Sequence, residues 1–273
     1  MGLGHEKIDR FRAVATSFGS RSTAPPSIRT ARPTLRQSQG PVTPPRQWFR
    51  RFVLDPHVLT RPGTVLLDTA RPGSVNRRCR CFTTPRDVFV ADTPAEVPRL
   101  LDSLQEATEA GRHVAGYLTY EAGYPFVDLE TPVTVEGPVA WFGVYDRPHV
   151  LAPAEVERGL EAVDGTPVIE DAELSVSRDA YVDAVQRIRR HIGAGDVYQI
   201  NYTAPVHFRS TGDPRSLYRR LRRQQRVPYG AYLNSGDRHI LCCSPELFFR
   251  CEGNRVMTRP MRHHPTRTDP GRG

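Results

Sequence analysis

Apolar residues along the chain recur at two spacings, one typical of strands and one typical of helices. Short apolar runs predict strands over 64–68, 87–91, 114–121 and 139–145. Thr93-Pro94-Ala95-Glu96 has the sequence of a helix capping box, with proline at the first helical position. Gly111 is expected to end this helix, whose apolar face is made of Val97, Leu100, Leu101, Leu104 and Ala107.

The second half of the chain also alternates between the two patterns. Residues 152–176 are polar and acidic, which predicts a connection. Ser177 and Asp213 each precede a stretch with helical spacing, so each is expected to cap a helix. Residues 197–203 alternate as a strand does. Four later runs predict a β-meander over 231–233, 240–243, 247–251 and 255–258. The mixture predicts an α+β fold in which antiparallel sheet dominates the second half.

The first 46 residues have a different composition from the rest. They are rich in Ser, Thr, Pro and Arg and show no hydrophobic periodicity. Such a segment cannot bury enough apolar surface to offset the entropy of ordering it, which predicts a disordered basic tail. An arginine-rich, acid-poor start also fits an organelle transit peptide, so a plastid location stays open beside a cytoplasmic one.

The formal net charge of +8 is confined to the start of the chain. Residues 1–54 hold ten Lys and Arg against Glu6 and Asp9, and the remaining residues hold equal numbers of basic and acidic side chains. The part expected to fold therefore has no basic excess, and the charge gives no support for nucleic-acid binding. No apolar run approaches the roughly 20 residues that a membrane-spanning helix needs, so no membrane span is expected.

Lysine and cysteine usage limit the possible chemistry. Lys7 is the only lysine, so no mechanism that needs a lysine amine in the body of the protein can run on this chain. Arginine is no substitute, because its guanidinium stays protonated. The five cysteines are odd in number and form no CxxC pair, which indicates structural thiols rather than a metal or redox site. This usage fits a reducing cytoplasm.

The common short motifs of catalysis are missing from the sequence. It contains no P-loop, GxGxxG, HExxH or GxSxG motif, and the nine histidines form no metal-ligand pattern. The arginines that follow Asp213 indicate a solvated helix face rather than a phosphate-binding patch: Arg219, Arg220, Arg222, Arg223 and Arg226.

Longer segments carry a resemblance to a known family. Residues 116–124 are GYLTYEAGY, residues 195–203 are GDVYQINYT and residues 244–248 are SPELF, while 66–72 and 256–261 give two further collinear matches. Together these segments resemble the component I enzymes of the chorismate-utilising family. The aminodeoxychorismate synthase branch is closer than the anthranilate synthase branch.

The resemblance implies a two-lobed antiparallel-sheet fold and a reaction that replaces the 4-hydroxyl of chorismate with an amino group. In that family a separate glutamine amidotransferase subunit delivers ammonia, and Mg²⁺ holds the substrate carboxylate. The match makes Glu246 the general acid that protonates the leaving hydroxyl. It makes Gln199 a neutral amide where isochorismate and salicylate synthases have a lysine. Without the resemblance, Glu246 is interpreted as a surface or capping carboxylate at a turn, and the alternative for Gln199 is an ordinary polar residue of a strand.

The sequence departs from the family at Arg262. That arginine stands in the place of the PIKGT lysine that attacks the ring, where it would meet substrate without being able to do that chemistry. The resemblance implies an N-terminal fragment of component I that is incomplete at its C-terminus, lacks the Mg²⁺ ligands and is inactive by itself. The implied segments are a basic tail (1–46), an N-terminal component I domain (47–165), the first part of the chorismate-binding domain (166–260) and an aberrant tail (261–273).

Two other functions stay open. The chain is alternatively a non-catalytic module that binds the amidotransferase partner or an aromatic effector. The family places an effector pocket near Leu67, Asp68 and Cys79. The other alternative is a fragment of an anthranilate synthase component I, which differs in the aromatic product that the complete enzyme releases.

Overall fold

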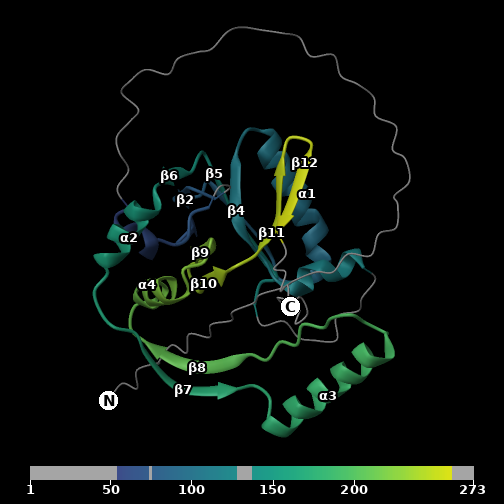
Figure 1. The fold of residues 1–273 in the computed structure, drawn as a ribbon. Coiled ribbons are helices and arrows are strands. Elements are labelled where there is room, and N and C mark those ends of the chain that lie inside the picture. The colour runs from purple at the N-terminus through teal and green to yellow at the C-terminus, as the bar shows by residue number, and fades with distance from the viewer. Residues whose placement is uncertain (1–53, 74–75, 128–136, 260–273) are drawn as a thin grey trace, which may run out of the picture.

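The computed structural model describes residues 54–73, 76–127 and 137–259 (Figure 1). Helices and antiparallel sheets alternate along this part of the chain, as an α+β fold requires. Every strand pairing in it is antiparallel. The α+β class predicted from the sequence is therefore confirmed for the described residues.

A five-stranded sheet joins strands from both halves of the chain. Its order is β10 (His239–Ser244), β9 (Tyr229–Asn234), β1 (Thr64–Asp68), β2 (Cys79–Phe82) and β6 (His149–Leu151). One face packs under the helices α2 (Pro153–Glu161) and α4 (Pro214–Gln225) and the short 3-10 helix η2 (Pro56–Thr60). Leu66 points into this core, while its neighbour Val65 points to the other face, because successive strand residues alternate between faces.

A three-stranded sheet packs against that other face. Its order is β3 (Asp87–Ala91), β5 (Ala140–Tyr145) and β4 (His113–Leu118). Val65, Phe82, Trp141 and Tyr145 share the core between the two sheets. The far face of the smaller sheet is covered by α1 (Val97–Glu109), with η3 (Pro94–Glu96) and η4 (Tyr120–Phe126) beside it. The result is a layered body of helices, sheet, sheet and helix.

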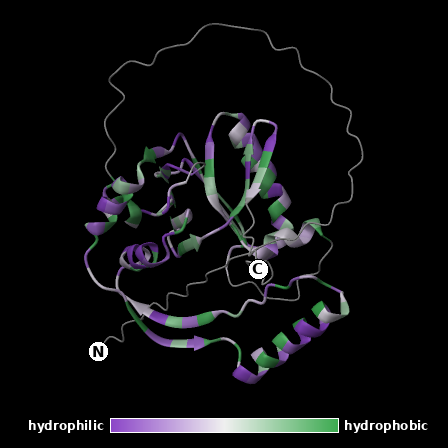
Figure 2. Cartoon of the chain, viewed as in Figure 1, coloured by the Kyte–Doolittle hydropathy of each residue, from purple (hydrophilic) through white to green (hydrophobic). Residues whose placement is uncertain are grey.

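Three elements extend from this body as a separate group. Strands β7 (Val168–Leu174) and β8 (Val206–Thr211) pair only with each other, and α3 (Arg178–Ala194) lies between them in sequence (Figure 1). Figure 2 shows green apolar positions along β8 and α3. Several apolar side chains of β7, α3 and β8 are exposed, among them Val168, Ile169, Tyr181, Ile192 and Val206. A second hairpin of β11 (Leu247–Glu252) and β12 (Arg255–Arg259) also forms a sheet of its own.

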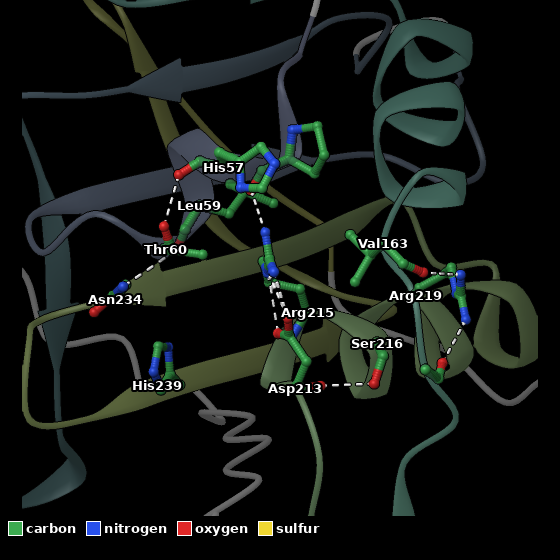
Figure 3. A network of polar contacts seen from close by, with 12 residues as sticks. His57, Leu59, Thr60, Val163, Asp213, Arg215, Ser216, Arg219, Asn234 and His239 are labelled. Atoms are coloured by element: carbon green, nitrogen blue, oxygen red, sulfur yellow. Dashed lines mark hydrogen bonds and ion pairs between the residues drawn. The ribbon is translucent and has the colours of Figure 1, made fainter.

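The predicted helix boundaries are confirmed. Glu96 closes a capping box with Thr93, and its carboxylate accepts the backbone N–H of Thr93 at 3.0 Å. Ser177 Oγ accepts the N–H of Ala180 at 3.2 Å, and Gly195 ends α3 with a left-handed φ of 80°. Asp213 caps α4 by accepting the N–H of Arg215 at 2.8 Å, and the Arg215 side chain folds back onto the same carboxylate (Figure 3).

Two predictions about the middle of the chain are wrong. Residues 152–176 are not simply a connection, because they contain α2 and β7. Pro153 starts α2, the Glu155 carboxylate accepts the N–H of Ala152 at 2.7 Å, and Val156 and Leu160 form a buried stripe four residues apart. The glutamates on the outer face of α2 make the segment acidic overall, so its composition alone does not reveal this apolar stripe.

The strand predicted over 197–203 is also wrong. That segment has no regular secondary structure, and β8 starts only at Val206, after Pro205, whose carbonyl accepts the N–H of Ser175 at 2.8 Å. An alternating sequence forms a strand only where a neighbouring strand can pair with it, and β7 pairs with residues 206–211 instead.

Two other boundaries differ from the prediction. The strand predicted over 114–121 ends at Leu118, and Tyr120 already belongs to η4. The predicted meander divides into two hairpins in different sheets, because β10 pairs with β9 and β11 pairs only with β12. The segments 1–46 and 261–273 lie outside the described residues. Within those residues, no helix has both the length and the apolarity that a membrane crossing requires.

Candidate functional site

Glu246 lies in a tight turn between β10 and β11. The Ser244 hydroxyl accepts the backbone N–H of Glu246 at 3.2 Å, and it also donates to the carbonyl of Glu246 at 3.1 Å. A serine side chain that bonds the backbone two residues later stabilises such a turn. Glu246 is half-buried and directly precedes Leu247, the first residue of β11. The turn therefore fixes the backbone from which the Glu246 side chain extends, next to β10 of the five-stranded sheet.

Gln199 lies in the irregular segment between α3 and β8. Its side chain is exposed, and its amide donates to Asn201 Oδ1 at 3.1 Å. The start of this segment is tied to α3 by a contact of 2.9 Å between His191 Nδ1 and Asp196 Oδ2. In the described structure no hydrogen bond or ion pair joins Gln199 to Glu246, so their joint action stays a prediction.

The third residue expected near substrate, Arg262, lies outside the described residues. Among residues 54–73, 76–127 and 137–259, no three His, Cys, Asp or Glu side chains gather as metal ligands do. The absence of the family's Mg²⁺ ligands from this chain stays a prediction.

Asp68 and Cys79 come together in a buried polar cluster under α4. Asp68 Oδ1 accepts the Cys79 thiol at 3.1 Å, while Oδ2 accepts the Tyr218 hydroxyl at 3.0 Å and Arg222 Nε at 2.5 Å. Leu67, the third residue expected in an effector pocket, belongs to the opposite face of β1 and is partly exposed. The carboxylate of Asp68 is thus fully engaged by side chains of the protein itself.

Burial keeps the two hydrogen-bond donors of this cluster protonated. Burial and the nearby Asp68 carboxylate raise the pKa of Cys79 to about 12. The same two causes, burial first, raise the pKa of Tyr218 well above its usual value. A protonated thiol and a protonated phenol can both donate a hydrogen bond to the Asp68 carboxylate.

Arg222 connects this cluster to α2. Its guanidinium binds Asp68 and also contacts the Glu157 carboxylate and the carbonyl of Pro153. Only 7% of the Arg222 side chain is exposed. The interpretation of Arg222 as part of a solvated face is therefore wrong, although Arg220 and Arg223 are exposed. Arg222 follows Tyr218 by four residues and so shares its inward face, which is the signal in the sequence that locates it.

We expect the cysteines to differ sharply in reactivity toward a thiol-alkylating reagent at neutral pH. The thiolate is the reactive form, and burial raises the pKa of Cys79 and Cys81 to about 12 and that of Cys243 to about 11. Cys251 is exposed, so it should be alkylated first, and Cys79 and Cys81 should stay unmodified in the folded protein. Peptide mass mapping over time measures this order.

Full alkylation of all five cysteines in denaturant is the control for this experiment. Labelling of Cys79 or Cys81 at the rate of Cys251 in the native protein would contradict the burial of β2.

Comparison with known proteins supports the resemblance seen in the sequence. Residues 65–262, more than half of the chain, match the family described as chorismate binding enzyme. The chain is 40% identical over 85 residues to anthranilate synthase component 1 of Thermus thermophilus, an alignment that covers 31% of this chain and 18% of the relative. It is 37% identical over 124 residues to the 2-amino-4-deoxychorismate synthase of Streptomyces globisporus, covering 44% and 25%.

A third relative belongs to the branch favoured by the sequence. The aminodeoxychorismate synthase component 1 of Bacillus subtilis is 35% identical over 85 residues, covering 31% of this chain and 18% of the relative. In each of these three alignments the matched part spans a quarter or less of the relative's length. The match of residues 65–262 shows the family at the level of the whole chain: this protein belongs to the chorismate binding enzymes.

Proposed function

We propose that this chain provides the acid-bearing part of a site that aminates chorismate, as in aminodeoxychorismate synthases. The geometry of Glu246 carries the proposal, because the Ser244 hydroxyl binds both the N–H and the carbonyl of Glu246 and so fixes the backbone that carries the carboxylate. Relatives named for aminodeoxychorismate and for anthranilate synthesis support the substrate class.

Glu246 acts as the general acid in this proposal. Loss of a hydroxyl group from the ring needs a proton donor, and a half-buried carboxyl at a fixed turn is suited to deliver one. Gln199 contributes a neutral amide that binds a substrate oxygen without activating water. Its exposed side chain donates one amide N–H to Asn201, and the second N–H can donate to a ligand.

Other components are required for turnover. The single lysine, Lys7, lies outside the described residues, and the described carboxylates do not gather into an Mg²⁺ site. We therefore propose that the isolated chain binds chorismate without aminating it, and that a further polypeptide segment and a glutamine amidotransferase in the cytoplasm complete the reaction. An effector-binding role has less support, because Cys79, Tyr218 and Arg222 already engage the Asp68 carboxylate.

Calorimetric titration with chorismate tests the proposal. The wild-type chain should bind, and Gln199→Ala should bind about tenfold more weakly, because one hydrogen bond to a charged substrate group is lost. Glu252→Gln is the control, since Glu252 lies on β11, is exposed and pairs with Arg250. Absence of binding, or equal affinity of the Gln199 variant, would refute the assignment.

A product assay with ammonia and Mg²⁺ tests the dependence on other components. We expect neither aminodeoxychorismate nor anthranilate from the isolated chain. Robust formation of aminodeoxychorismate would overturn the claim that the isolated chain is inactive, and it would support the proposed aminodeoxychorismate synthase branch. Anthranilate as the product would overturn the branch.

A further inference from the structure

A small pocket lies where α4 meets the loop that follows α2. It has a volume of about 240 Å³ and is lined by Thr166, Pro167, Ser216, Arg219, Arg220, Arg223 and Gln224. Three of these residues are arginines and none is a carboxylate. The pocket is unrelated to the Glu246 turn, because its walls come from the loop 163–167 and the outer side of α4.

Arg219 fixes the wall of this pocket. Its guanidinium donates to the carbonyls of Val163 and Gly165, the latter at 2.9 Å (Figure 3). Gly165 has a φ of 91°, a conformation that glycine adopts without strain, and it turns the chain so that Thr166 and Pro167 face α4. Both contacts of Arg219 are to neutral carbonyls, so its positive charge is not neutralised by them.

The other two arginines differ in their partners. Arg223 donates to Glu157 at 3.1 Å and to Glu161 at 2.9 Å, so its charge is balanced and its position is fixed. Arg220 is exposed, and the described structure contains no ion pair or hydrogen bond of its guanidinium. The pocket therefore has two uncompensated positive charges, from Arg219 and Arg220.

The small volume, the positive charge and the arginines already held in place by hydrogen bonds together favour one class of ligand. A guanidinium binds phosphate oxygens in pairs through parallel N–H groups, and several arginines together match a tetrahedral dianion better than a planar monoanion. A volume of about 240 Å³ holds a phosphate group with a few waters but not a large cofactor. Thr166, whose hydroxyl is a neutral donor, also lines the pocket.

We propose that this arginine-lined pocket binds a phosphate group, either free or as a small phosphate monoester. Arg220 is the principal ligand, since its guanidinium has no internal partner. Arg219 adds a second positive charge, and Arg223, held by Glu157 and Glu161, forms part of the pocket wall. Binding here would attach the loop 163–167 more firmly to α4 and so stabilise the folded protein.

The test is a thermal-unfolding titration with inorganic phosphate at constant ionic strength set with chloride. We expect a saturable rise in the melting temperature of the wild-type chain and affinity about tenfold lower in Arg220→Gln, since one charge-assisted contact is lost. Arg226→Gln is the matched control: Arg226 ends the same helix, carries the same charge and does not line the pocket. It should bind as the wild type does.

Three results would overturn the proposal. One is a melting temperature that rises no more with phosphate than with chloride. A second is equal phosphate affinity of the Arg220 and Arg226 variants. The third is equal binding of malonate, which would assign the pocket to carboxylates instead. Chorismate binding is not involved in this measurement, so its outcome is independent of the proposed amination site.

Discussion

Arg222→Met is expected to lower the free energy of unfolding by about 3–5 kcal/mol, because it removes one partner of a buried ion pair. Asp68 has 1% of its side chain exposed, so without the guanidinium its carboxylate would be left buried with no cationic partner. Glu157 on α2 would lose its contact with the same group. Methionine fills a similar volume, so the loss reports on charge rather than on a cavity. Equilibrium urea unfolding followed by circular dichroism measures the change.

Arg223→Met is the matched control for this prediction. Arg223 lies on the same helix and also pairs with Glu157, but half of its side chain is exposed. Exposed ion pairs contribute about 0–1 kcal/mol, so this variant should unfold close to the wild type. The double variant Arg222→Met with Asp68→Asn should recover part of the stability, because no buried carboxylate is then left without its cationic partner. Equal losses in the two single variants would show that Arg222 is not a buried partner of Asp68.

The sequence predicted a helix start or a strand correctly where the capping residue or the apolar run was sufficient to define it. Ser177 and Asp213 mark their helices correctly because a cap depends on contacts only two or three residues away. The strand over 64–68 was also recognisable, since β1 is central and its apolar residues face two cores. These predictions needed no information about distant parts of the chain.

Long-range pairing explains what the sequence could not predict. The alternating pattern over 197–203 suggests a strand, yet pairing with β7 begins only at 206. The role of Arg222 depends on Asp68, which is 154 residues away in sequence. The candidate acid Glu246 was recognisable only through the SPELF segment, because a single glutamate at a turn has no periodic signature. The contacts that define the site come from tertiary structure.

Gly116→Ala is expected to destabilise the protein by about 3 kcal/mol, since no room exists for a methyl group at this position. Gly116 lies in β4 directly opposite Phe142 of β5. A Cβ there would lie 1.9 Å from the carbonyl oxygen of Trp141 and 2.7 Å from the Cα of Phe142. Both obstacles are backbone atoms, so relief requires β5 to move away from β4. For a domain of this size, the expected fall in melting temperature is about 10 °C.

Gly123→Ala in the same nine-residue segment gives the matched comparison. A Cβ at Gly123 would meet no atom within 4 Å, and the residue is exposed in η4. Its melting temperature should therefore stay within about 2 °C of the wild type. The two variants separate packing from the loss of glycine itself, because both make the same chemical change. If neither variant changed the melting temperature, β4 and β5 could not be as close as the structure has them. The glycine that begins GYLTYEAGY would then need an explanation other than the contact between these two strands.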